Sequence, residues 1–267
     1  MFEDEKPKID PSQLSKRDRK MLDPEQDAVL QKGGRKQGKK VEVPRPKENP
    51  RQAEVEDLYQ SVEWYRWDTN YAFIFADHTR EIRKHPEIAE QLKARRLIDL
   101  GCGDSYLNIL WFATRFEVPA YVGVDRGDYV PLRFEEGGER HTISDSHQIE
   151  NGAELVAKYL RKKYNDEAIQ PIHFQFVPDD MLRYLAGEPD GSANITSNGF
   201  AIPDLPRNKA YLDRLAEEVA RVVPVGGIVL TLENRPFHRL TEQGFQKTEI
   251  GQIECYIKEE QEEQVRS

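Results

Sequence analysis

The stretch Leu97-Ile98-Asp99-Leu100-Gly101-Cys102-Gly103-Asp104-Ser105 decides the fold of this chain. In it, an apolar run of strand type ends on an acidic residue and passes directly into a Gly-x-Gly turn. Two glycines let the backbone turn sharply from a strand into a helix and approach a ligand closely, which residues bearing a Cβ would obstruct. The stretch therefore predicts a strand, a turn and a helix, with a nucleotide-like ligand at the turn.

Strand and helix patterns alternate after this turn. An apolar helix is followed by a buried strand, residues 120–125, that ends on the carboxylate of Asp125. This order is typical of the first half of a doubly wound α/β sheet, whose ligand lies at the C-terminal ends of the strands. Later strands are predicted at 172–177, 193–197, 228–233, 240–245 and 253–257. Helices are predicted at 55–75, 79–93, 107–113, 152–163 and 208–223. A break is predicted at Pro86 and a turn at 178–182.

We expect one α/β domain with an appendage, because 267 residues are too few for two full-sized domains and their linkers. The expected parts are a disordered basic arm at 1–50, lid or packing helices at 51–95 and the main domain at 96–260. A polar loop or small insertion is expected at about 126–152. The aromatic residues Trp64, Tyr65, Trp67 and Tyr71 are expected to pack in the core, and the alternative is a cap over a ligand.

The composition excludes a protein built on conventional membrane-spanning helices. Charged residues make up 33% of the chain and hydrophobic residues 37%, and no apolar run approaches the ~18 residues that a span needs. The first residues contain no apolar segment, so we expect no secretory signal. The two cysteines, Cys102 and Cys255, show neither a disulfide framework nor a metal-ligand spacing. We therefore expect a cytoplasmic protein without a bound metal.

The net charge of −9 is unevenly distributed along the chain. Residues 6–51 contain 14 Lys and Arg against 7 Asp and Glu, whereas the remainder is acidic. Few aromatic residues and several prolines prevent this basic arm from burying enough apolar area to offset the entropy of ordering. The arm either contacts RNA, the ribosome or an acidic partner, or it is a solvated tail, which is the interpretation that charged termini generally favour.

Two nucleotide classes are disfavoured by the residues of the turn. A dinucleotide fingerprint needs a third glycine, Gly-x-Gly-x-x-Gly, and Tyr106 occupies that position here. A phosphate-binding P-loop needs Gly-Lys-Ser/Thr, which the chain lacks. The turn therefore points to a ligand other than NAD or a nucleoside triphosphate.

The chain resembles the class I S-adenosylmethionine-dependent methyltransferases over about residues 90–260. Asp99 to Ser105 match the first motif of the family, an acidic residue followed by x-Gly-x-Gly-x-Gly, with Ser105 in place of the last glycine. Residues 223–230 are similar to the family's Pro-Gly-Gly turn into its fifth strand, and Gly244-Phe245 to the pair that opens its last hairpin. The resemblance implies a seven-stranded, mostly parallel, Rossmann-like sheet with helices on both faces and a C-terminal antiparallel hairpin.

The resemblance also implies S-adenosyl-L-methionine as the cofactor. Asp125 would then hold the ribose hydroxyls, and Asp180 with the backbone of Met181 would lie beside the adenine, with Asp179 an equal alternative. Asp99 would orient the turn or reach the methionine amino group through water, and bonding local N–H groups is the alternative role. The full predicted cofactor set is Asp99, Gly101, Cys102, Gly103, Ser105, Asp125, Arg126, Asp180 and Met181.

The acceptor side is less well defined. Asn198, after the fourth strand, is the candidate substrate-binding residue, although an Asn-Gly pair also forms turns. The Asn/Asp-Pro-Pro-Tyr/Phe motif of amino-methylating nucleic-acid enzymes is missing at this place, which disfavours base N-methylation by that route. His141, His147 and His238 are candidate general bases, and no catalytic residue is assigned.

The sequence therefore predicts a cytoplasmic transferase that methylates a small molecule, an RNA or a protein with S-adenosylmethionine as donor. The alternative is a non-catalytic, methyltransferase-like binding or scaffold protein, associated with RNA or the ribosome through the basic arm. Ser105 in the glycine motif keeps this alternative open. Any nucleic-acid contact is expected through residues 6–51, and no membrane contact is expected.

Overall fold

The computed structural model describes residues 50–60, 79–102, 106–125, 132–136, 139–143, 145–147, 151–197, 209–231, 235–251 and 253–260. All of them belong to one compact unit, residues 47–267. Residues 1–49 and the aromatic residues between 64 and 71 lie outside the described ranges, so the expectations about them stay predictions. No helix in the described ranges is both long and apolar enough to cross a lipid bilayer.

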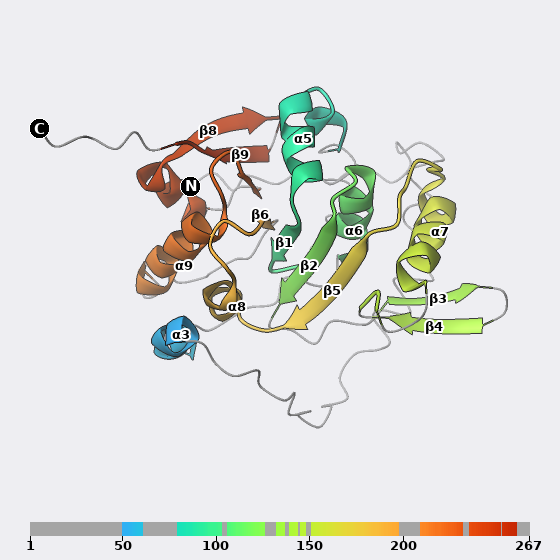
Figure 1. Ribbon diagram of the computed structural model, residues 1–267, viewed down its shortest axis with the longest axis horizontal. Helices are drawn as coiled ribbons and strands as arrows, with labels where there is room; N and C mark the ends of the chain where they lie inside the picture. The colour runs from blue at the N-terminus through green and yellow to red at the C-terminus, as the bar shows by residue number, and fades with distance from the viewer. Residues whose placement is uncertain are drawn as a thin grey trace, which may run out of the picture. The chain divides into compact units, whose positions relative to one another are not determined.

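A seven-stranded sheet forms the centre of this unit (Figure 1). Its spatial order is β5-β2-β1-β6-β7-β9-β8. Neighbouring strands from β5 to β7 are parallel, whereas β9 runs antiparallel to both β7 and β8. The predicted fold class, a doubly wound, mostly parallel Rossmann-like sheet with a C-terminal antiparallel hairpin, is confirmed. The strands are β1 (Leu97–Leu100), β2 (Ala120–Asp125), β5 (His173–Pro178), β6 (Asn194–Ser197), β7 (Ile228–Thr231), β8 (Phe245–Ile250) and β9 (Ile253–Lys258).

The central strands are buried along their whole length. Every residue of β1, β6 and β7 is buried, as expected for parallel strands that helices cover on both faces. The edge strand β5 alternates instead, with Phe174 and Phe176 buried and His173 and Gln175 exposed. The apolar runs of the sequence therefore correspond to the middle of the sheet, and the alternating run corresponds to its edge.

Helices cover both faces of the sheet (Figure 1). One core cluster joins α5, α6 and α7 to strand residues such as Leu97, Tyr121 and Phe174. A second cluster joins α3, α8, α9 and the 3-10 helix η3 to strand residues such as Ile98 and Val122. The helices are α3 (Pro50–Gln60), α5 (Pro86–Ala94), α6 (Tyr106–Arg115), α7 (Gly152–Tyr164), α8 (Met181–Gly187), α9 (Lys209–Val222) and η3 (Arg235–Gln243).

Local residues account for several helix ends. Pro86 occupies the first turn of α5, where its missing N–H has no helical partner to lose, so the predicted break at this residue is confirmed. Asn165 ends α7 in the left-handed conformation, with φ of 49°, and its N–H bonds to the carbonyl of Arg161. Asp180 begins α8 by accepting hydrogen bonds from two backbone N–H groups of the first turn.

Three sequence-based boundaries were wrong. The predicted turn at 178–182 contains the start of α8, which is too short to show a helical period in the sequence. Residues 240–243 belong to η3 and not to a strand, and β8 begins at Phe245 after Gly244, whose φ is 80°. The polar insertion expected at about 126–152 contains a hairpin of β3 (Leu132–Glu136) and β4 (Glu139–Ile143), for which no strands were predicted. The helix predicted from Val55, α3, begins at Pro50.

Candidate functional site

The parallel strands β1, β2, β5, β6 and β7 all end on one side of the sheet, which we call the carboxyl edge. Strand β1 lies between β2 and β6, so the chain leaves it toward one side and later returns on the other. In doubly wound sheets, ligands bind in the crevice at such a topological switch point. The glycine turn follows β1 directly and therefore lies at this point.

The turn is bonded to the end of the neighbouring strand. Gly101 has φ of 72°, a left-handed conformation that favours glycine. Its N–H donates to the carbonyl of Val124 at 2.8 Å, and the N–H of Cys102 donates to the same carbonyl at 3.2 Å. These two bonds place the turn beside Asp125, the last residue of β2. Gly103 and Ser105 lie outside the described residues.

Cys102 packs beneath the turn. The residue is buried, and a Cβ added to Gly123 would come within 3.0 Å of its sulfur and within 2.8 Å of the Phe176 ring. A glycine at position 123 therefore lets the turn, β2 and β5 approach one another closely. The side chain of Cys102 belongs to this packing, and its predicted contact with a cofactor stays a prediction.

Asp99 is a buried carboxyl group in β1. Only 3% of the residue is exposed, and its Oδ2 accepts a hydrogen bond of 2.9 Å from the hydroxyl of Tyr121, which is itself fully buried. Burial raises the pKa of Asp99 to about 7, and the charge of Asp125 acts in the same direction, whereas the Tyr121 bond lowers it. Burial also raises the pKa of Tyr121, so its hydroxyl stays neutral and donates. The carboxyl group of Asp99 is therefore partly ionised near neutral pH.

Asp125 and Asp179 lie close together on the carboxyl edge. Asp125 is half-buried and pairs in register with Pro178, the last residue of β5, and Asp179 follows directly. The predicted ribose-binding and adenine-binding regions are therefore neighbours, as one nucleoside would require. Arg126 lies outside the described residues.

The carboxylate of Asp180 is engaged within the protein. The residue is 2% exposed, and its Oδ1 accepts from the N–H groups of Leu182 at 2.8 Å and Arg183 at 3.2 Å. The hydroxyl of Tyr211 donates to both of its oxygens at 3.1 and 3.2 Å. Asp180 therefore holds α8 and α9 in place. Its predicted contact with adenine stays a prediction, as does that of Met181, which is 5% exposed.

Asp179 is the more exposed of the two neighbouring carboxylates. Its Oδ1 accepts from the backbone N–H of Asp180 at 2.8 Å, and the Nη1 of Arg183 donates to both of its oxygens at 3.1 and 3.2 Å. Its side chain is 19% exposed. Because an ionised carboxylate has about four acceptor positions, Asp179 retains capacity for a further donor.

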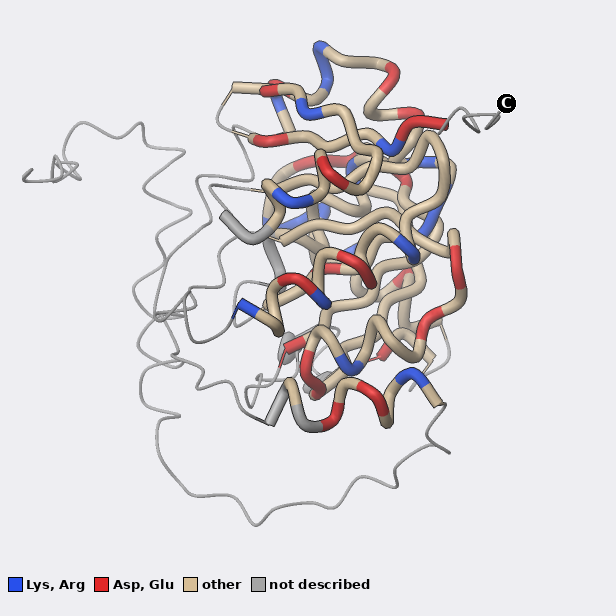
Figure 2. Tube along the Cα trace, turned by 90° about the vertical axis from the view of Figure 1, so that its left-hand side faces the viewer, with Lys and Arg blue, Asp and Glu red and all other residues tan. Residues whose placement is uncertain are grey.

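The carboxyl edge is acidic where the structure describes it. Among residues 97–102, 120–125, 177–183 and 194–197, Arg183 is the sole cation, and it is paired with Asp179. Figure 2 shows Lys and Arg interspersed with Asp and Glu along the described elements. A phosphate-rich ligand needs cationic or N–H donors at its site. The described carboxylates instead fit hydroxyls, amino groups and a cation, which are the groups that S-adenosylmethionine carries.

Sequence reasoning missed four residues that build this edge. Tyr121 supports Asp99, Tyr211 and Arg183 hold the two carboxylates after β5, and Ser197 donates from its Oγ to the carbonyl of Leu100 at 2.9 Å. The last bond joins the ends of β6 and β1. The only sequence signal among them is the i, i+4 spacing of Asp179 and Arg183, which a helix beginning at Met181 would have revealed. Asn198 lies outside the described residues.

The candidate bases fall in different places. His147 stacks on His173, with ring centroids 4.8 Å apart, at the start of β5. Six residues of strand span roughly 17 Å, so His147 lies far from the carboxyl edge along β5. His238 lies in a surface groove with residues of α9 and η3. His141 lies in β4. Within the described ranges, no group of three or more His, Cys, Asp or Glu is arranged to hold a metal ion.

No protein-family model and no curated protein matches the chain. Among solved structures, an rRNA methylase from Streptococcus thermophilus aligns with 67% of this chain and 95% of its own, at 10% identity and a TM-score of 0.37. The N-methyltransferase NodS from Bradyrhizobium japonicum covers 67% and 97%, at 9% identity and a TM-score of 0.36. A TehB-like SAM-dependent methyltransferase from Corynebacterium glutamicum covers 71% and 98%, at 11% identity and a TM-score of 0.34.

The fold is the one that the resemblance to class I methyltransferases predicts. This assignment rests on the chain's own strand order and strand directions. The order differs from the six-stranded doubly wound order 3-2-1-4-5-6 only by the last strand, β9, which lies between β7 and β8.

Proposed function

We propose that the chain is an S-adenosylmethionine-dependent methyltransferase whose cofactor binds at the carboxyl edge of the sheet. The observation that carries the proposal is the pair of hydrogen bonds from Gly101 and Cys102 to Val124, because they bring the glycine turn against the end of β2. Asp125 then stands beside a turn that a ligand can approach closely. The surrounding carboxylates suit a ligand with a diol, an amino group and a positive charge.

Each described carboxylate has a distinct role in this proposal. Asp125 accepts the two ribose hydroxyls, a charge-assisted arrangement in which each bond contributes about 1.5–3 kcal/mol. Asp99, in the strand that leads into the glycine turn, orients the turn and adds negative charge near the amino acid part of the ligand. Asp179, together with the backbone after it, faces the adenine. When bound, S-adenosylmethionine supplies an activated methyl group, and the protein's contribution is to bind, orient and exclude water.

The methyl acceptor is a small molecule, an RNA or a protein side chain, in a cytoplasmic setting. Residues 6–51 provide a basic segment that would attract RNA, whereas the described unit has an acidic carboxyl edge. Incubating the full chain with methyl-labelled cofactor and cell extract, and measuring the label in the RNA, protein and small-molecule fractions, identifies the acceptor class. Binding of cofactor without transfer to any fraction would support the alternative of a non-catalytic binding protein.

Isothermal titration with S-adenosylmethionine and S-adenosylhomocysteine tests the cofactor directly. We expect both to bind with 1:1 stoichiometry. Asp166→Ala serves as the matched control for aspartate substitutions at the carboxyl edge. Asp166 pairs with Arg115, at the end of α6, away from that edge. No binding of either compound to the folded chain would refute the proposed function.

A further inference from the structure

Helix α3 packs against the helices that follow β5 and β6. Val55 is fully buried in the same core cluster as residues of α8 and α9. Gln52 donates from its Nε2 to the carbonyl of Arg183 at 3.3 Å. A Cβ at Gly187 would come within 2.8 Å of that same nitrogen, so the glycine leaves room for the glutamine. The segment before the sheet is therefore part of the layer that supports the carboxyl edge.

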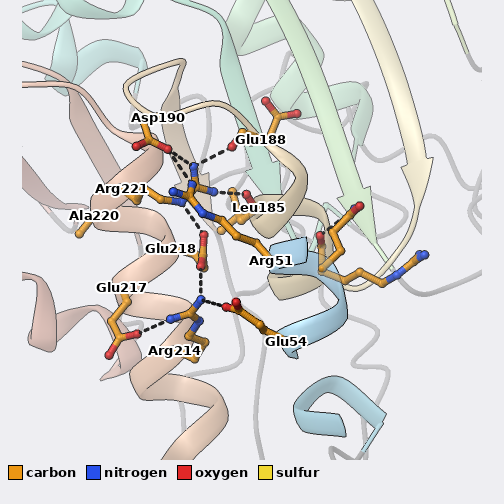
Figure 3. Close-up of polar contacts among 12 residues, drawn as sticks. Arg51, Glu54, Leu185, Glu188, Asp190, Arg214, Glu217, Glu218, Ala220 and Arg221 are labelled. Carbon is orange, nitrogen blue, oxygen red and sulfur yellow. Dashed lines mark hydrogen bonds and ion pairs between the residues drawn. The ribbon is translucent and has the colours of Figure 1, made fainter. Parts of the chain in front are cut away.

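Ion pairs at the outer side of this contact attach α3 to the domain (Figure 3). Arg51 pairs with Asp190 at 2.8 Å, and Arg221 pairs with the same carboxylate at 2.6 Å. Arg214 of α9 pairs with Glu54 at 3.4 Å and with the buried Glu218 at 2.9 Å. Arg51, Glu54 and Asp190 are well exposed, so these outer pairs contribute little to stability individually.

One arginine on the inner side links α3 to the predicted adenine region. The Nε of Arg183 lies 3.8 Å from Oε2 of Glu56, while its Nη1 donates to both oxygens of Asp179. The side chains of Arg183, Asp179 and Glu56 are only 13%, 19% and 27% exposed. The guanidinium therefore lies between two carboxylates, and the charge of Glu56 on the α3 side attracts the same rigid, planar group that holds Asp179.

We propose that Arg183 is a positioning residue that couples the docking of α3 to recognition of the adenine ring, through the chain Glu56, Arg183, Asp179. This inference rests on the proposed function, in which Asp179 faces the adenine. The guanidinium holds one side of the Asp179 carboxylate and leaves acceptor positions for the 6-amino group of adenine. A purine with a 6-oxo group presents an acceptor there and is rejected, since two acceptors face one another.

The test compares two ligands that differ only at this position, S-adenosylhomocysteine and its 6-oxo analogue S-inosylhomocysteine, by isothermal titration against the full chain. The wild type is expected to prefer the adenosine compound by at least about tenfold, the discrimination that one hydrogen bond to a charged group provides. In Arg183→Gln the preference should fall below about threefold, and Arg183→Lys, which keeps the charge, should restore part of it.

Two glutamates of α3 supply the matched comparison. Glu56→Gln removes the charge next to Arg183 and should lower the preference between the two ligands. Glu54→Gln removes an equivalent charge from the same helix, where it contacts Arg214 instead, and should leave the preference unchanged. A structural loss would weaken both ligands equally in every variant, so the ratio of the two affinities reports the positioning role.

The outcomes separate this inference from the proposed function. If the wild type binds neither ligand, the proposed function fails. If the wild type discriminates between the ligands and Arg183→Gln discriminates equally well, the coupling through Arg183 is overturned while the methyltransferase proposal stands. Equal effects of Glu54→Gln and Glu56→Gln on the ratio would overturn the link from α3.

Discussion

Replacing Asp99 by asparagine should abolish a pH dependence of stability that this one buried carboxyl creates. The folded state raises the pKa of Asp99 from 3.8 to about 7, chiefly through burial. The native protein therefore holds this proton more tightly than the unfolded chain does. The stabilising contribution is complete below the unfolded pKa and is lost as the pH rises through the folded pKa.

The magnitude follows from the two pKa values. One pKa unit corresponds to about 1.4 kcal/mol, so the group should lower the free energy of unfolding by about 3 kcal/mol between about pH 4.5 and about pH 7.5. Asparagine has no proton to lose over this range. The difference in unfolding free energy between Asp99→Asn and wild type should therefore move by about 3 kcal/mol in favour of the variant as the pH rises.

Urea unfolding followed by circular dichroism at both pH values measures this difference, and comparing variant with wild type cancels the other titrating groups. Tyr121→Phe provides a control of opposite sign, because it removes a hydrogen bond that lowers the pKa of Asp99. Its stability should fall more steeply with rising pH than that of the wild type. Parallel pH profiles for Asp99→Asn and wild type would refute the reasoning.

Four further substitutions test the carboxyl edge. Asp125→Ala should weaken S-adenosylhomocysteine binding by at least about tenfold in titration calorimetry, and an unchanged affinity would remove Asp125 from the ribose site. Asp180→Ala should lower the free energy of unfolding in urea by about 2 kcal/mol because the cap of α8 is lost. Asp179→Ala should lower the ligand affinity more than it lowers stability. The reverse pattern would exchange the roles of the two aspartates. Gly123→Ala should lower the free energy of unfolding by about 1–3 kcal/mol, since the added Cβ would lie 2.8 Å from the Phe176 ring. An unfolding free energy equal to that of the wild type would contradict this expectation.

The strands around the glycine turn were predictable because their signals are local. β2 occupies residues 120–125 as predicted, since five successive apolar or small residues are followed by an acidic one. α7 and α9 agree with their predicted ranges to within about one residue, because their apolar periodicity extends over more than three turns. Short elements were not predictable in this way. α8 has only seven residues and begins from an aspartate that the sequence pattern indicates equally well as a turn residue.

The roles of the two aspartates after β5 show where sequence reasoning ends. Asp179 and Asp180 are adjacent and chemically identical, so spacing cannot choose between them. Their partners come from other parts of the chain. Tyr211 of α9 bonds to Asp180, whereas Arg183 of α8 holds Asp179. The choice of partner depends on how α8 and α9 pack, which is a property of the folded unit.

The sequence by itself determined the doubly wound order, the glycine turn and the acidic strand end at Asp125. These depend on the backbone preferences and apolar patterns of neighbouring residues. Only the tertiary structure decided that the hydroxyl of Tyr121 stays neutral and donates to Asp99. It also decided that Asp180 is buried, and that α3 contacts Arg183. The last contact joins residues 131 positions apart, from Gln52 to Arg183. Such contacts form when separate elements bury their apolar faces together, and no local pattern encodes them.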